Sequence, residues 1–219
     1  MSKNLVLAVT GASGTAYALR LGQVLLRSDL HIHLIVSEAA RMVAMRELGV
    51  NLPPDSASGE DWKQFFDKGL ATGPTEDWGF SDIPGEVVGQ VSLHQRRDYS
   101  AGIASGSFLT RGMVICPCSM GTLSSIACGA STNLVQRSAD VHLKERRPLI
   151  LVPRETPLSS IALENMTKLS QAGATILPAM PGFYHKPAKL ADIVDFIVAR
   201  ICDQIGASHQ LMERWSEGE

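Results

Sequence analysis

Short apolar runs recur along the chain, and most are followed by a segment with the pattern of an amphipathic helix. The runs predict five strands: Leu5–Val9, Ile32–Val36, Met113–Cys116, Leu149–Val152 and Thr175–Leu177. The helical patterns predict six helices: Thr15–Arg27, Glu38–Leu48, Gly121–Cys128, Ser138–Glu145, Ser159–Gln171 and Leu190–Ile205. Strands that are apolar on both faces are typical of a parallel sheet covered by helices. The alternation therefore predicts a doubly wound, mostly parallel α/β fold, a three-layer sandwich of the flavodoxin-like or Rossmann-like class.

One stretch does not follow this alternation. Residues 51–107 are rich in Pro, Gly, Ser and Asp, with a short amphipathic piece at Asp61–Leu70 and a possible strand at Glu86–Leu93. A connection of this length is uncommon in a compact domain unless it is functional. We interpret it as an insertion or lid at about 51–107 within a single domain, 1–219.

Composition narrows the class of protein. The chain has 219 residues, is 45% hydrophobic and carries a formal net charge of −2, which provides a core and argues against intrinsic disorder. No basic excess points to nucleic acid or an anionic membrane, and no apolar run is long enough to span a bilayer. The N-terminus lacks the organisation of a signal peptide, and four cysteines are too few for a disulfide scaffold. We expect a soluble, cytoplasmic protein that binds neither nucleic acid nor membrane.

Small, hydroxylated and charged residues follow every predicted strand. Ligands of open α/β sheets bind outside the carboxyl ends of the strands, so these segments are expected to meet in one ligand site. The segments are Thr10–Thr15, Ser37–Ala40, Pro117–Thr122, Pro153–Pro157 and Pro178–His185.

Two of these segments suit a phosphorylated cofactor. The turn Gly11–Gly14 opens a helix whose N-terminal amides could bind a phosphate, although it could also be only a tight turn. Ser119 and Thr122 open another helix, and such hydroxyl-rich starts favour a ligand with phosphate, ribityl or ribose oxygens. Ser37 could be a ligand contact or simply an N-cap. Nicotinamide chemistry is disfavoured because the Tyr-x-x-x-Lys motif of short-chain dehydrogenases is missing. No tyrosine of this chain has a lysine four residues after it.

Charged residues suggest a second anion site. Arg154 directly follows a buried strand, with Glu155 beside it, so the pair is either a salt bridge or an anion-binding arginine next to an acid/base carboxylate. Tyr184 adds a hydroxyl donor after a Pro-Gly turn. Arg137 and Lys144 are seven residues apart and share one helix face.

Cys116 and Cys118 are interpreted as structural rather than as a metal or redox pair. They are only two thiols, separated by one residue, with no histidine nearby.

Five segments together closely resemble the flavin prenyltransferases of the UbiX/Pad type, formerly described as polyprenyl-hydroxybenzoate decarboxylases. They are Thr10–Gly14, Ile115–Ser119, Ala139–Pro148, Pro153–Pro157 and Pro181–His185. The resemblance implies metal-independent synthesis of prenylated FMN from reduced FMN and dimethylallyl phosphate. It also implies that the product serves as the cofactor of a partner UbiD-type decarboxylase.

The resemblance assigns roles residue by residue. The implied FMN contacts are Gly11, Ala12, Ser13, Ser37, Ser119, Met120, Gly121, Thr122 and Arg137. The implied contacts of dimethylallyl phosphate are Lys144, Arg154, Tyr184 and Arg200, and the implied catalytic residues are Ser13, Glu47 and Glu155. Without the resemblance, Glu47 and Arg200 would be interpreted as solvated helix charges.

Two further expectations concern assembly and the roof of the flavin. Glu47 lies about ten residues beyond Ser37, roughly 15 Å along a helix, so we expect it to reach a neighbouring subunit's site. This predicts a homo-oligomer, a dodecamer by resemblance. Family members roof the flavin with an aromatic residue from the segment that is longer here, and Tyr99 is the only stand-in.

Two other functions are weighed. A flavin-dependent decarboxylase of peptidyl or phosphopantothenoyl cysteine would share the fold class, but Pro117–Thr122 lacks that family's asparagine, and His31 and His33 lie in a strand rather than at its catalytic histidine. A flavin carrier without chemistry would need no second anion site, and Lys144, Arg154, Glu155 and Tyr184 are expected on one rim.

Overall fold

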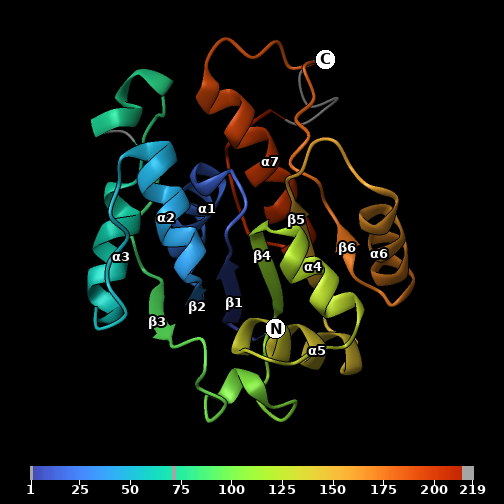
Figure 1. Cartoon of the computed structure of the whole chain (residues 1–219). Helices are drawn as coiled ribbons and strands as arrows, with labels where there is room; N and C mark the ends of the chain where they lie inside the picture. The colour runs from blue at the N-terminus through green and yellow to red at the C-terminus, as the bar shows by residue number, and fades with distance from the viewer. Residues whose placement is uncertain (1, 71–72, 214–219) are drawn as a thin grey trace.

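A six-stranded parallel sheet forms the centre of the computed structural model, which describes residues 2–70 and 73–213 (Figure 1). Its strand order is β3-β2-β1-β4-β5-β6, and every pairing is parallel. The strands are β1 (Asn4–Val9), β2 (His31–Val36), β3 (Gln90–His94), β4 (Gly112–Cys118), β5 (Leu149–Pro153) and β6 (Thr175–Ile176). The predicted doubly wound α/β fold is confirmed.

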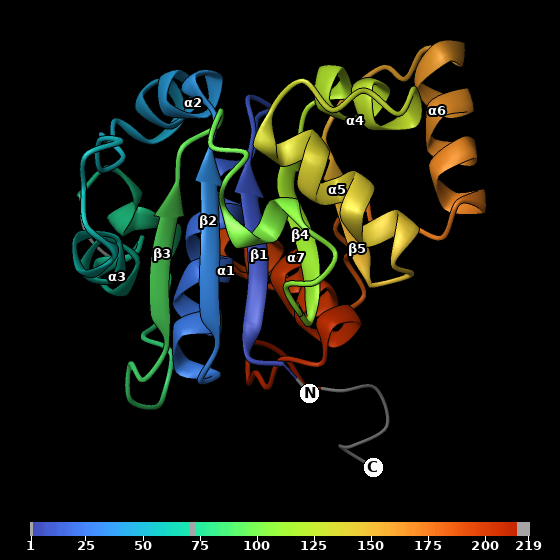
Figure 2. The same cartoon turned by 90° about the horizontal axis from the view of Figure 1, so that it is seen from below.

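Helices cover both faces of the sheet (Figures 1 and 2). They are α1 (Thr15–Arg27), α2 (Glu38–Leu48), α3 (Gly59–Lys68), α4 (Met120–Ala127), α5 (Leu134–Lys144), α6 (Ser160–Gln171) and α7 (Leu190–Ile205). Alternate residues of β1 enter two separate cores: Leu5 and Leu7 pack with α1, α3 and α7, whereas Val6 and Ala8 pack with α4, α5 and α6. All four side chains are fully buried, which explains why the strand is apolar at successive positions.

The segment interpreted as an insertion supplies part of the sheet. Besides α3, it contains two short 3-10 helices, η1 (Gly73–Trp78) and η2 (Gly102–Ala104), and strand β3. β3 extends the sheet beyond β2, with His31 opposite Gln90 and Ile35 opposite His94. The possible strand at Glu86–Leu93 therefore exists, displaced to Gln90–His94, and the segment is more than a lid.

A buried ion pair joins the first and last helices. Arg20 of α1 is 2% exposed, and its Nε and Nη2 donate to the two carboxylate oxygens of Asp195 on α7 at 2.7 and 3.0 Å. A third donor, Nη1, reaches the carbonyl oxygen of Ser81 at 2.9 Å. The guanidinium thus fixes α1, α7 and the segment before β3 to one another.

In the part of the chain that the structure describes, no helix is both long and apolar enough to cross a bilayer.

Candidate functional site

The carboxyl ends of β1 and β4 are adjacent at the point where the strand order reverses, which is where open α/β sheets form a ligand crevice. Thr10 ties the two ends together. Its hydroxyl donates to the Pro117 carbonyl and accepts from the Ser119 N–H, both at 2.8 Å. The turns after β1 and β4 are therefore held as one rigid unit.

The turn Gly11–Gly14 is packed tightly against α2. A Cβ at Gly11 would lie 2.4 Å from the Ala39 Cβ, so only glycine allows this approach. Gly14 has a φ of 115°, which favours glycine as well. Ala12 is buried and Ser13 half-buried within the same turn. The backbone of the turn is thereby brought to the crevice.

Two serines cap helices at this edge. Ser37 Oγ accepts from the Ala40 N–H at 3.0 Å, and Ser119 Oγ accepts from the Thr122 N–H at 3.3 Å. Ser119 also donates to Thr122 Oγ1 at 3.0 Å. The capping interpretation of Ser37 is confirmed, and it leaves ligand contact open for both. The start of α4 is accessible, because a Cβ at Gly121 would meet nothing within 4 Å; Met120 beside it is half-buried.

Glu47 belongs to its own chain's site. Its carboxylate accepts from the N–H groups of Gly14 at 3.0 Å and Thr15 at 3.1 Å, at the N-terminus of α1. The expectation that Glu47 reaches a neighbouring subunit is therefore wrong. Its reason is geometric: α2 lies beyond the arrowhead of β2, at the carboxyl edge of the sheet (Figure 2), so the helix carries Glu47 towards β1.

Arg154 and Glu155 do not form the alternative salt bridge. Glu155 Oε1 accepts from the N–H of Thr156 at 3.1 Å, and no described residue forms an ion pair with Arg154. Both side chains are exposed and line a hollow that also includes Pro178 and Met180. An exposed cation without a carboxylate partner is available to an anionic ligand.

An aromatic cluster lies between β6 and α7. The Tyr184 ring meets Phe196 of α7 edge-on at 5.7 Å between centroids, and the His185 ring stacks on Phe196 at 5.2 Å. Arg200 follows Phe196 by one helical turn on the same face, and its Nη1 pairs with Asp203 at 3.0 Å. Tyr184 thus packs on α7, and Arg200 lies further along that helix, towards the end where the Ile205 carbonyl accepts from Arg111 Nε beside the amino end of β4.

Lys144 lies apart from these groups. It ends α5, which leads into the amino end of β5, whereas Arg154 follows the carboxyl end, and five strand residues span about 15 Å. Lys144 pairs with Glu145 beside Gly106. The expectation that Lys144 shares one rim with Arg154 is wrong within a single chain.

Arg137, in the first turn of α5, donates to the Ala104 carbonyl at 3.0 Å and pairs with Asp140.

Sequence comparisons show which family the chain belongs to. The profile of the Flavoprotein family matches residues 1–202. A flavin prenyltransferase UbiX of Halalkalibacterium halodurans is 48% identical over 209 residues, covering 95% of this chain and 91% of the relative. The UbiX of Pseudomonas aeruginosa is 46% identical, with 98% of this chain and 95% of the relative covered. The chain belongs to the UbiX flavin prenyltransferase family.

Solved structures of similar proteins agree with this family. AnUbiX (PadA1), in complex with FMN and dimethylallyl pyrophosphate, superimposes with a TM-score of 0.80 at 33% identity, with both chains covered completely. A dodecameric FMN-dependent UbiX-like decarboxylase of Escherichia coli O157:H7 gives 0.76 at 38%, covering 97% of this chain and 99% of the other. The cysteine decarboxylase TvaF, at 14% identity and 0.51, shares the fold alone. Neither the cysteine decarboxylase nor the carrier function is favoured.

In this UbiX family member, Cys116 and Cys118 are buried and unpaired with each other. Burial raises the pKa of both thiols, with a smaller increase at Cys116 from Cys118, so both stay protonated. No group of three or more metal-binding side chains is present among the described residues. The structural interpretation of the two cysteines agrees with this environment.

Two tyrosines of the family member remain to be placed. Tyr99 lies in the segment before β4, where its hydroxyl donates to the Ser131 carbonyl at 3.1 Å; its role as a flavin roof stays a prediction. Tyr17, in the first turn of α1, was given no role by the sequence. Its ring lies against Gly14, and it is the aromatic residue closest in sequence to the glycine turn, which is the signal that could have found it.

Proposed function

We propose that this chain joins a dimethylallyl group from dimethylallyl phosphate to N5 and C6 of reduced FMN, producing prenylated FMN. The observation that carries the proposal is the meeting of two anion-binding features at one sheet edge. One is the accessible start of α4, and the other is Arg154 without a carboxylate partner, beside Glu155. The related AnUbiX was solved with FMN and dimethylallyl pyrophosphate, which are ligands of these two kinds.

The FMN phosphate is proposed to bind at the start of α4. The α1 N-terminus already holds the Glu47 carboxylate, so it is not available to a second anion. The amides after Ser119 and the hydroxyl of Thr122 supply donors, and the absence of a side chain at Gly121 leaves room. The Gly11–Ser13 backbone, Ser37 and Arg137 are proposed to complete the flavin contacts.

The prenyl donor is proposed to bind next to the flavin through three cations and one hydroxyl group. The negative charge on the leaving phosphate would be stabilised by Arg154, Arg200, Lys144 and the hydroxyl of Tyr184. Reduced FMN, when bound, supplies the nucleophilic N5 and C6 positions. Closing the ring at C6 requires a proton to be added to the alkene carbon C2 of the attached dimethylallyl group and a proton to be lost from C6. Glu155 is the carboxylate best placed to accept the C6 proton, directly or by relay through the departing phosphate, which can in turn return a proton to the alkene. Ser13 is proposed to act from the turn after β1, next to the flavin.

The position of Lys144 supports an oligomeric enzyme. Because one chain holds Lys144 and Arg154 at opposite ends of β5, a second copy must provide the lysine if both act on one donor. The related E. coli protein is dodecameric, which agrees with such sharing. Delivery of the product to a UbiD-type decarboxylase remains a prediction from the family resemblance, and a cytoplasmic location remains a prediction from composition.

A prenylation assay tests the proposal. The purified protein is incubated without oxygen with dithionite-reduced FMN and dimethylallyl phosphate, and the released flavin is analysed by mass spectrometry. We expect tight binding of FMN but not of FAD or NAD(P), and a donor-dependent mass gain of one five-carbon unit. Flavin binding without a mass gain would instead support a carrier or a decarboxylase, and tight NAD(P) binding without flavin binding would overturn both halves of the proposal.

A further inference from the structure

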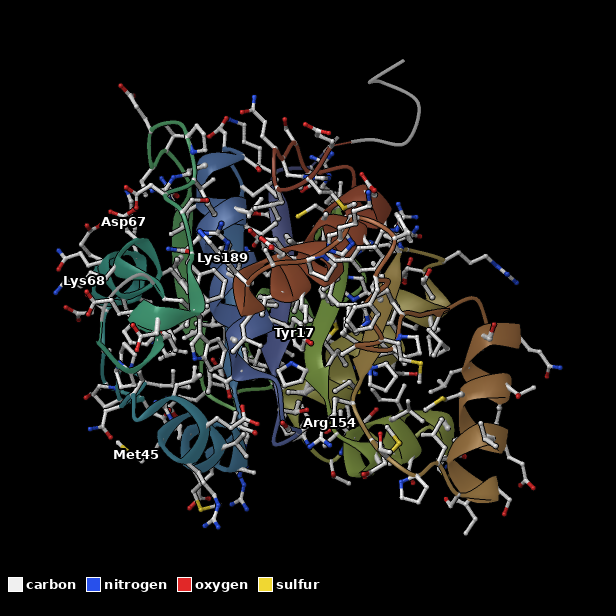
Figure 3. The ribbon with its side chains drawn as sticks, turned by 90° about the horizontal axis from the view of Figure 1, so that it is seen from above. Tyr17, Met45, Asp67, Lys68, Arg154 and Lys189 are labelled. Carbon is white, nitrogen blue, oxygen red and sulfur yellow. The ribbon has the colours of Figure 1, made fainter. Side chains whose placement is uncertain are left out.

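Tyr17 is fixed at the junction of the two halves of the proposed site. A Cβ at Gly14 would lie 2.8 Å from Tyr17 Cδ2, 3.0 Å from Cε2 and 3.8 Å from the Pro117 Cβ. The ring therefore lies against the turn after β1, and the end of β4 is next to the same glycine. Figure 3 shows Tyr17 on α1 and Arg154 after β5 in the same central region of the molecule.

Two charged side chains, Glu47 and Arg154, act on the phenol of Tyr17. Burial raises the pKa of Tyr17, with smaller increases from Cys116 and Glu47 and a decrease caused by Arg154. The hydroxyl therefore stays protonated at neutral pH and lies within electrostatic reach of both Glu47 and Arg154. No hydrogen bond joins it to any other residue that the structure describes.

The neighbouring groups decide what this hydroxyl can bind. The Glu47 carboxylate is already satisfied by the N–H groups of Gly14 and Thr15, so it does not require the phenol proton. Arg154 is a second donor without a carboxylate partner among the described residues. It follows Pro153, which pairs with Cys118 at the end of β4, next to the Pro117 that lies beside the Gly14 turn. Two unused donors, one neutral and one cationic, complement a phosphate oxygen.

We propose that Tyr17 is a substrate-binding residue whose hydroxyl, together with Arg154, holds the phosphate of the prenyl donor. The inference rests on the proposed function for the identity of the donor. The ring has a separate role, since it supports the Gly14 turn on the flavin side. Removing the hydroxyl alone should therefore affect the phosphate and leave the flavin in place.

The test compares Tyr17→Phe with wild type in the FMN-loaded protein. Hydrogen bonds to charged groups are among the stronger ones, so we expect the Kd for inorganic phosphate, by calorimetry, and the KM for dimethylallyl phosphate to rise about tenfold. The FMN Kd should stay within about twofold, because the ring is retained. Thr167→Val, which removes an exposed α6 hydroxyl bonded to the Leu163 carbonyl, is the matched control and should change neither value.

A double-mutant cycle with Arg154→Ala sharpens the test, because two groups that share one phosphate lose affinity non-additively. Unchanged phosphate binding in Tyr17→Phe, or a loss of FMN affinity in its place, would overturn the inference. The proposed function fails separately: if wild type binds phosphate through Tyr17 but yields no prenylated flavin, the subsite stands and the reaction does not.

Discussion

Arg154 and Glu155 are adjacent in sequence but are expected to act on different parts of the reaction. Arg154 makes no ion pair with a described residue, and the one hydrogen bond that the Glu155 carboxylate accepts within the described part of the chain is local, from the Thr156 N–H. Because neither neutralises the other, the cation is available to the phosphate and the carboxylate to a proton. The sequence suggested both residues, and the structure removes the salt bridge as the alternative.

Glu155→Gln is expected to retain FMN and the prenyl donor while slowing product formation by about 10²–10⁴-fold, the usual contribution of a general base. The amide keeps the shape of the side chain but cannot accept the proton lost at C6. Anaerobic single-turnover assays measure the rate, and fluorescence titration measures FMN affinity. Turnover at the wild-type rate would mean that the proton leaves through phosphate or water alone.

Stability should depend on pH through a histidine cluster on β2 and β3. His33 Nδ1 lies 2.9 Å from His94 Nε2, and its ring centroid is 4.4 Å from that of His31. Burial lowers the pKa of His33 to about 4, with smaller decreases from His31 and His94. Since the folded protein disfavours the charged ring, this stabilisation is present above the unfolded pKa near 6.5 and is lost as the pH falls towards 4.

Urea unfolding at pH 7 and pH 4 measures this loss. We expect His33 alone to account for about 3 kcal/mol of the decrease in the free energy of unfolding, by linkage between its folded and unfolded pKa values. His33→Gln should unfold with a correspondingly smaller difference between the two pH values. A decrease of equal size in the variant and wild type would assign the acid sensitivity to other groups.

At the scale of elements, the features that short stretches of sequence determine were predicted correctly. The bounds of α1, α2 and α7 agree with the predicted ranges, and Ser37 caps α2 as expected, because apolar spacing and N-caps are local signals. α5 begins earlier than predicted, at Leu134, because Asn133 caps it through the Gln136 N–H. β3 was displaced because this edge strand is only partly buried and lacks a clear apolar run.

Local sequence signals could not predict which site the Glu47 carboxylate reaches. Helix spacing gives its distance from Ser37, but the direction of α2 is set by tertiary contacts, including the close approach of Ala39 to Gly11. Lys144 is separated from Arg154 because one residue precedes β5 and the other follows it. Spacing along a helix shows which side chains share a helix face but does not show this separation. Tyr17 was missed because its closeness in sequence to the glycine turn was not used as a signal.

The buried ion pair between Arg20 of α1 and Asp195 of α7, called the α1–α7 clamp below, gives a prediction for the packing of these helices. Asp195→Ala leaves the buried Arg20 guanidinium without its carboxylate, and the loss of one partner of a buried pair costs about 3–5 kcal/mol. Chemical denaturation should show this decrease. Asp140→Ala, which removes the half-exposed partner of Arg137, is the control and should cost about 1 kcal/mol or less. Equal losses in the two variants would contradict the importance of the clamp.

At the scale of the whole molecule, the site is expected to combine residues of two copies. The Glu47 carboxylate binds the α1 N-terminus of its own chain, so Lys144 is the residue that a second copy would supply. Lys144→Ala and Arg154→Ala should each weaken donor binding when alone. If the two residues come from different subunits, an equimolar mixed oligomer contains sites with both, and activity should recover to about a quarter of wild type. Mixed oligomers without activity would place both residues in one chain's site.

The most direct measurement of the central claim is the mass of the flavin released from wild type and from Arg154→Ala after anaerobic incubation with reduced FMN and dimethylallyl phosphate. We expect a gain of one five-carbon unit with wild type. Arg154→Ala should still bind FMN but give little of this product at the same donor concentration. A wild-type flavin of unchanged mass, or full product from Arg154→Ala, would contradict a prenyl-transfer site built at the carboxyl edge of this sheet.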